Sequence, residues 1–121
     1  MASSHRDYVP RNPAQFNVFL QNLIHYVDER TGGTNPQWPD IPTDRLQALK
    51  GSHRLFDAAF NEAVAAPTHA NILRRKEEQA ACVAVLRGFV NQFLRFPPVT
   101  NPDRAEMGIP NHDNIRTDQS A

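Results

Sequence analysis

Three long stretches of the chain repeat apolar residues at the three- and four-residue spacing of an α-helix, and proline or glycine bounds each stretch. They cover about residues 13–30, 44–66 and 70–95. No stretch alternates convincingly between apolar and polar residues at period two, as a half-buried strand would. The sequence therefore predicts an all-α domain in which three long helices pack up, down and up as a bundle.

The apolar faces of these helices supply enough large side chains for one shared core. The seam of the second helix contains a single polar residue, His53. The predicted seam positions are Phe16, Leu20, Leu23 and Val27 in the first helix, Leu46, Leu49, His53, Phe56, Phe60 and Ala63 in the second, and Ile72, Gln79, Cys82 or Val83, Leu86, Val90 and Phe93 in the third.

Capping signals divide the rest of the chain. Asn12 is typical of the residue before a helix, and Thr100 or Asn101 predicts a short C-terminal helix over about 101–107 that Gly108 ends. We expect an extended N-terminal arm over residues 1–11, a helical bundle domain over 12–107 and an extended C-terminal tail over 108–121.

Three segments carry a pattern that covers nearly the whole chain: "DYVPRNPAQFNVFLQNLIHYV", "VLRGFVNQFL" and "FPPVTNPDRAEMGIPNHDNIRT". A D-Y-x-P opening precedes a helix with an aromatic-rich face, and P-x-V-T-x-x-D-R-x-x-x-G-I followed by H-D-N-I-R-T closes the chain. The pattern resembles a widespread family of uncharacterised bacterial helical proteins. The resemblance implies a helical fold and transfers no catalytic residue, because that family carries no established reaction.

The composition favours one domain and disfavours two classes of partner. A length of 121 residues suits a single domain. The 13 Lys and Arg residues balance the 13 Asp and Glu residues, so no net field attracts nucleic acid. No apolar run approaches the roughly 18 residues of a membrane-spanning helix, and the N-terminus lacks the apolar stretch of a secretory signal. We therefore expect a cytoplasmic protein without nucleic-acid or membrane partners, with leaderless export left open.

Histidine and carboxylate spacing raises one chemical possibility. His53 and Asp57 lie four residues apart on one helical face and could hold a metal ion or orient the imidazole, with His25 as a further ligand. The favoured alternative is a partly buried His53 that bonds a carbonyl group or Asp57, and a His25 stabilised by the helix dipole.

Cys82 is expected to fill core space. Because catalytic, phosphate-loop, dinucleotide and zinc motifs are lacking, we expect no enzyme, no cofactor and no metal.

The charges of the third helix allow more than one interpretation. Residues 73–79, "LRRKEEQ", favour a solvated face over a phosphate site, since the two glutamates offset the attraction of the basic residues. Gly88 in mid-helix costs up to about 1 kcal/mol relative to alanine, which predicts that another backbone approaches it. We expect Arg87 to lie at that contact and to pair with a carboxylate, within the chain or across an interface.

Apolar and aromatic residues in otherwise polar segments favour a protein-interaction role. The predicted contact residues are Tyr8, Pro10, Trp38, Arg87, Ile109 and Ile115. For Trp38 the favoured interpretation is a ring that covers the end of the bundle, with a partner-facing anchor as the alternative, and Ile109 is also expected to fold back against the helices. The predicted function is a non-enzymatic interaction or assembly module whose ends contact other copies of the chain or a neighbouring protein. The alternative is a small-ligand or metal-binding bundle centred on His53 and Asp57.

Overall fold

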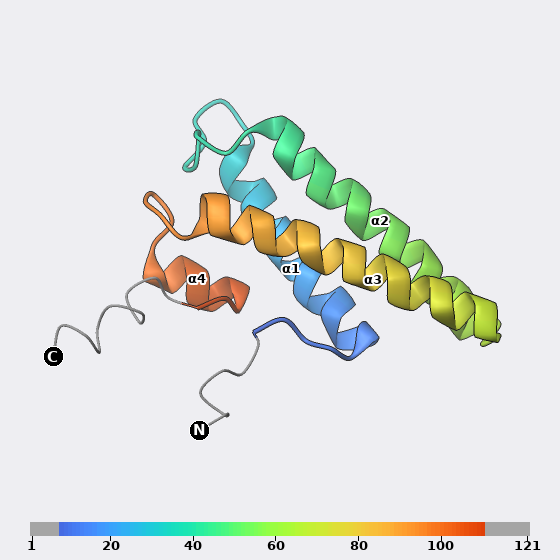
Figure 1. Cartoon of the computed structure of the whole chain (residues 1–121). Helices are drawn as coiled ribbons and strands as arrows, with labels where there is room; N and C mark the ends of the chain where they lie inside the picture. Colours follow the sequence, from blue (N-terminus) through green and yellow to red (C-terminus); the bar gives the residue numbers. More distant parts are fainter. Residues whose placement is uncertain (1–7, 111–121) are drawn as a thin grey trace, which may run out of the picture.

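In the computed structural model, which describes residues 8–110, helices joined by loops confirm the predicted fold class (Figure 1). The elements in chain order are α1 (Pro13–Thr31), α2 (Thr43–Ala65), α3 (His69–Phe89), the π-helix η2 (Val90–Leu94) and α4 (Asn101–Met107). Each predicted helix boundary lies within one residue of the observed one when α3 and η2 are taken together. No strand occurs in this part of the chain.

Local side-chain chemistry explains where two of the long helices begin. The Asn12 side chain accepts hydrogen bonds from the backbone N–H groups of Ala14 and Gln15, at 2.9 and 3.1 Å. Thr68 caps α3 in the same way by accepting from the Asn71 N–H at 3.1 Å. These bonds satisfy N–H groups that have no partner within the helix, so short-range sequence signals were sufficient to predict both starts.

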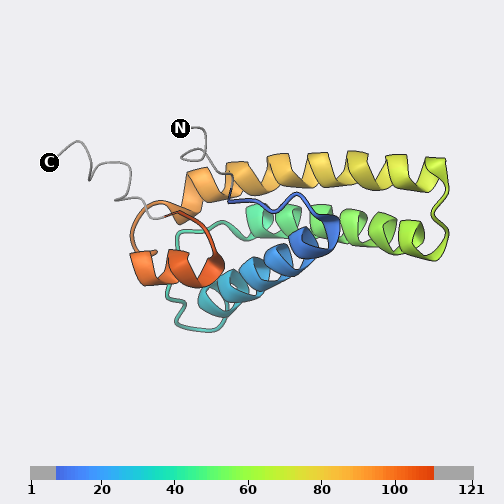
Figure 2. The same cartoon turned by 90° about the horizontal axis from the view of Figure 1, so that it is seen from below.

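α2 and α3 run side by side as an antiparallel pair, and α1 crosses one side of it (Figure 1). Figure 2 shows α1 running obliquely to this pair, so the turn end of the pair extends beyond α1. α4 lies near the opposite end and packs against α1. The turn end of the pair, residues 61–81, is therefore mostly exposed, and Ala63 is its only buried residue. The core therefore lies in the half of the molecule that contains η2 and α4.

One apolar core joins the helices and both ends of the described chain. Phe16 of α1 contacts Phe56 of α2 edge to face, with 5.1 Å between the ring centroids. The core cluster consists of Val9, Phe16, Leu20, Leu23, Val27, Trp38, Leu46, Leu49, Phe56, Cys82, Leu86, Phe89, Val90, Leu94, Val99, Met107 and Ile109. Because Val9 and Ile109 belong to the expected arm and tail, each of those segments is anchored to the bundle at one buried residue at least.

Residues 99–109, the first part of the closing motif, form a capped helix that docks on α1. The Thr100 side chain accepts from the Asp103 N–H, and the Asp103 carboxylate accepts from the Thr100 N–H, which makes a reciprocal capping box. Gly108 ends α4 with a φ of 79°, in the left-handed region that favours glycine. The Tyr26 hydroxyl donates to Asp103 Oδ1 at 2.6 Å and so connects α1 to the start of α4.

Arg104 is buried where α4 meets η2, with 5% of its surface exposed. Its Nη1 donates to the carbonyl oxygens of Leu94 and Val99 at 3.1 and 3.2 Å, and its Nη2 donates to Asn101 Oδ1 at 2.7 Å. The guanidinium thus satisfies a carbonyl at the end of η2 and another in the loop that follows. The most specific motif in the sequence therefore has a structural role at these positions.

Candidate functional site

Residues 8–11 lie along the bundle between α1 and α3 (Figure 2). Val9 is buried in the core, and the Tyr8 ring packs near Phe19 of α1 with 6.3 Å between the ring centroids. From α3, the Gln79 side-chain amide donates to the Arg11 carbonyl oxygen at 3.0 Å. These contacts hold the segment against both helices.

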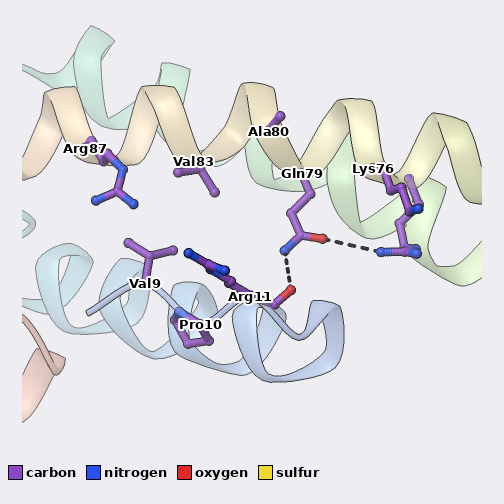
Figure 3. Close-up of a pocket in the computed structure, with 9 residues that line it drawn as sticks. Val9, Pro10, Arg11, Lys76, Gln79, Ala80, Val83 and Arg87 are labelled. Atoms are coloured by element: carbon purple, nitrogen blue, oxygen red, sulfur yellow. Dashed lines mark hydrogen bonds between the residues drawn. The ribbon is translucent and has the colours of Figure 1, made fainter. Parts of the chain in front are cut away.

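A groove of about 460 Å³ lies between this segment and α3 (Figure 3). Its volume is within the range of roughly 300–1,000 Å³ that is common for ligand sites. Apolar and basic side chains make up most of the lining, and none of the lining residues within 8–110 is acidic. The lining residues are Val9, Pro10, Arg11, Arg75, Lys76, Gln79, Ala80, Val83 and Arg87.

Helical periodicity explains why α3 presents basic residues to the groove. The α3 residues form two adjacent rows with four-residue spacing: Arg75, Gln79, Val83 and Arg87 in one row, and Lys76 and Ala80 in the other. Glu77 and Glu78 follow directly in the sequence but line no part of the groove. The solvated face predicted for residues 73–79 agrees with their exposure, since none of them is buried. The two glutamates do not offset the basic residues within the groove, however, because they face other sides of the helix.

Three of the four basic residues that line the groove take part in none of the ion pairs found among the described residues. They are Arg11, Arg75 and Lys76, of which Arg75 donates to the Gln79 side-chain oxygen at 3.5 Å. The guanidinium carbon of Arg87 lies 5.6 Å from the centre of the Tyr8 ring, a cation–π distance. Positive charge is thus concentrated locally on a chain whose net charge is zero.

The structure separates the predicted interaction residues into two groups. Pro10 and Arg87 line the groove, and Tyr8 lies beside it. Trp38 instead has 2% of its surface exposed, and its backbone N–H donates to the Arg30 carbonyl oxygen at 2.9 Å. The favoured prediction, that the Trp38 ring packs on the bundle, agrees with this burial, and the alternative of a partner-facing anchor is wrong, because the ring forms part of the core.

Ile109 is buried and folds back against the bundle, as one of its two predicted roles required. A buried Ile109 anchors the end of α4 and is not available as a contact for a partner. Ile115 lies outside the described residues.

The close backbone approach predicted at Gly88 is not found among the described residues. A Cβ atom at this position would meet nothing within 4 Å. Gly88 instead lines a second groove of about 310 Å³ between α2 and α3, in which Arg45 is the one basic residue among the described lining residues. The prediction failed because a missing side chain on a helix can leave a surface depression as well as a packing contact. A carboxylate partner for Arg87 stays a prediction.

His53 and Asp57 are joined by Asn17 of α1. Asn17 Oδ1 lies 2.7 Å from His53 Nε2, and Asn17 Nδ2 donates to Asp57 Oδ1 at 3.0 Å. Burial lowers the pKa of His53 below its ordinary value of 6.5, although the nearby Asp57 charge acts in the opposite direction. A neutral imidazole with its proton on Nε2 suits this geometry, since it can donate to the amide oxygen. The arrangement is a polar bridge between α1 and α2.

The third metal candidate, His25, does not join this bridge. It lies exposed on α1, with its Nε2 3.1 Å from a Glu29 carboxylate oxygen. Within residues 8–110, no group of three or more His, Cys, Asp or Glu side chains could hold a metal ion. Cys82 is fully buried in the core, as predicted, and burial raises the pKa of its thiol.

None of the described helices combines the length and the apolar character needed to cross a membrane. Comparison of the chain with protein-family models, with curated proteins and with solved structures finds no match, so the resemblance of its closing motif to bacterial helical proteins stays a prediction.

Proposed function

We propose that the chain is a non-enzymatic helical interaction module that binds a segment of another protein chain in the groove between residues 8–11 and α3. The bound segment belongs to a neighbouring protein or to a further copy of this chain. A cytoplasmic location in a bacterium is part of the same proposal. In this proposal residues 8–11 of the predicted arm form one wall of the site, because Val9 is buried in the core and holds them against the bundle.

The observation that carries the proposal is the order of side chains along the groove. Figure 3 shows Arg87 at one end, Val83 and Ala80 in the middle, and Lys76 at the other end. Protein interfaces commonly combine an apolar centre with a polar, partly charged rim. A groove of this composition fits a peptide better than a purely polar small molecule.

The length of the groove also fits a peptide. Arg75 and Arg87 are twelve positions apart on α3, which corresponds to about 18 Å along the helix axis. An extended chain advances about 3.3 Å per residue, so five or six residues of a bound segment would span the site. Short extended segments are a common form of peptide recognition, with alternate side chains entering a groove.

The alternative of a metal-binding or small-ligand bundle has less support. The Asn17 side chain already hydrogen-bonds to both His53 and Asp57, and His25 lies elsewhere on α1, next to Glu29. Neither His53 nor Asp57 lines the groove described above.

Selection of random twelve-residue peptides displayed on phage against the immobilised full-length chain tests the proposal. Ala80 is exposed and lines the groove, so Ala80→Phe adds a bulky side chain to the lining without disturbing the core. Ala84→Phe is the matched control, because Ala84 is exposed on the same helix but lines the second groove. We expect enriched peptides that lose binding with Ala80→Phe and keep it with Ala84→Phe. An absence of enrichment, or enrichment that Ala80→Phe leaves unchanged, would contradict the proposal.

A further inference from the structure

We infer that the segment bound in this groove is acidic, with carboxylates near both of its ends and apolar residues between them. The inference rests on the proposed function and adds the chemistry of the partner. Basic side chains lie on both walls of the groove, and apolar side chains lie between them.

The basic residues surround the apolar part of the groove. Figure 3 shows Lys76 toward one end of the groove on α3, Arg87 toward the other end, and Arg11 on the opposite wall. Arg75, which also lines the groove, directly precedes Lys76 in the chain. Arg11 and Lys76 are exposed, so their charges are accessible to a ligand. Carboxylates form charge-assisted hydrogen bonds with guanidinium and ammonium groups, and guanidinium can hold a carboxylate with two parallel bonds. An extended acidic segment could therefore contact both ends and the opposite wall at once.

A single small anion fits this surface poorly. The basic residues at the two ends are separated by about 18 Å along α3, so one phosphate or one carboxylate would meet only one end. The partly exposed or exposed apolar residues between them, Pro10, Ala80 and Val83, would then not be covered by the ligand. An elongated ligand with apolar groups in its centre uses the whole lining.

A nucleic-acid strand is also elongated and anionic, but two features favour a peptide over it. No aromatic ring is among the described residues that line the groove, and the Tyr8 ring beside it already packs near Phe19 and Arg87, so bases would find no ring in the lining on which to stack. The chain has 13 basic and 13 acidic residues, and such a balance provides no long-range field for a polyanion. The groove therefore fits a ligand that carries a few charges at defined positions.

Fluorescence anisotropy with two labelled peptides tests the inference on the full-length chain. The probe has eight residues, with two glutamates at each end and four apolar residues between them. The comparison peptide carries glutamine in place of each glutamate, which keeps the shape and removes the charge. We expect the glutamate peptide to bind about tenfold more tightly at low salt, because several exposed ion pairs each contribute a modest attraction. The difference should shrink as salt is added, since salt screens exposed charges.

Charge-reversal variants locate the binding site. Arg11→Glu combined with Lys76→Glu should weaken the glutamate peptide about tenfold, because both attractions become repulsions. Arg45→Glu combined with Arg54→Glu is the matched control: all four positions are exposed, both double variants change the net charge equally, and neither control residue lines this groove. The control should change binding less than about twofold. Circular dichroism and thermal unfolding of each variant establish that the helices still form.

Four outcomes would overturn the inference. Equal binding of the two peptides, or equal weakening by the two double variants, would remove the preference for acid while the phage selection with Ala80→Phe still tests the proposed function. Failure of both peptides to bind would also overturn the inference, and phage enrichment would then decide whether peptide binding itself stands. Tighter binding of a labelled single-stranded oligonucleotide, weakened by the Arg11 and Lys76 reversals, would assign the groove to nucleic acid.

Discussion

Replacing Arg104 with alanine is expected to lower the free energy of unfolding by about 3–5 kcal/mol. The side chain is almost completely buried and donates hydrogen bonds to three residues: Leu94 at the end of η2, Val99 in the following loop and Asn101 at the start of α4. Its removal leaves two backbone carbonyl groups and one side-chain amide without their donor.

The magnitude follows from these three bonds. A hydrogen bond to a charged group contributes about 1.5–3 kcal/mol, so the bonds to Leu94, Val99 and Asn101 set the upper limit of the loss. Burial of the charge offsets part of this sum, and Arg104 Nε is buried with no hydrogen-bond partner among residues 8–110. A net loss of about 3–5 kcal/mol would be a large fraction of the stability of a domain, which is typically about 5–15 kcal/mol.

Urea unfolding followed by far-ultraviolet circular dichroism measures the change. Arg104→Lys should lose about 1.5–3 kcal/mol, because one ammonium group cannot reach three acceptors in different directions. Arg95→Ala is the control: Arg95 lies beside the same loop but makes a single 3.5 Å contact, to Asn91 Oδ1, and its replacement should cost less than about 0.5 kcal/mol. A loss below about 1 kcal/mol for Arg104→Ala would refute the assigned role, since one hydrogen bond alone would account for it.

Three further predictions concern titratable groups. Burial would raise the pKa of Asp103, but hydrogen bonds from Tyr26 and Thr100 outweigh this effect and lower the pKa below 3.8. The ionised Asp103 carboxylate therefore stabilises the fold above pH 3.8, and this stabilisation is lost as the pH falls further. Tyr26→Phe should therefore cost about 1–2 kcal/mol at neutral pH in urea unfolding and less in acid, and an equal cost at both would contradict this. Burial lowers the pKa of His53 below 6.5, so as the pH falls His53 takes up its proton more readily in the unfolded chain than in the folded one. The free energy of unfolding should therefore decrease as the pH falls below 6.5, and His53→Gln should reduce that decrease. An unchanged dependence of stability on pH in His53→Gln would contradict the prediction. The Cys82 thiol should react with a disulfide reagent only as the chain unfolds, so rapid reaction of the native protein would show that it is not buried.

The helices could be predicted because their signals are local. Asn12 and Thr68 cap helices through bonds that reach only two or three residues along the chain. The apolar stripe of α1 repeats within one helix, and all four of its positions are buried. The capping box of α4 likewise lies within four consecutive residues, so its start near Thr100 was visible in the sequence.

The polar links between helices could not be predicted because they join residues far apart in the chain. Asn17 and Asp57 are 40 positions apart, and Tyr26 and Asp103 are 77 positions apart. Nothing near Asn17 distinguishes it from a surface asparagine, since its burial depends on how α1 crosses α2. The spacing of His53 and Asp57 in α2 indicated that they share one face, but it could not indicate that Asn17 of α1 lies between them.

The basic groove shows why charges counted along a sequence can mislead about a surface. Residues 73–79 contain three basic and two acidic side chains, and the sum suggests weak attraction for any anion. On α3, however, Arg75 and Lys76 face the groove while the glutamates do not, so the sum has no meaning for a ligand bound there. The four-residue recurrence from Arg75 to Arg87 could have indicated one face of a helix. It could not have indicated a site, because the opposite wall is formed by residues 8–11, which reach α3 through a hydrogen bond between residues 68 positions apart. A chain with zero net charge can therefore still select a charged partner, provided that the fold separates its charges in space.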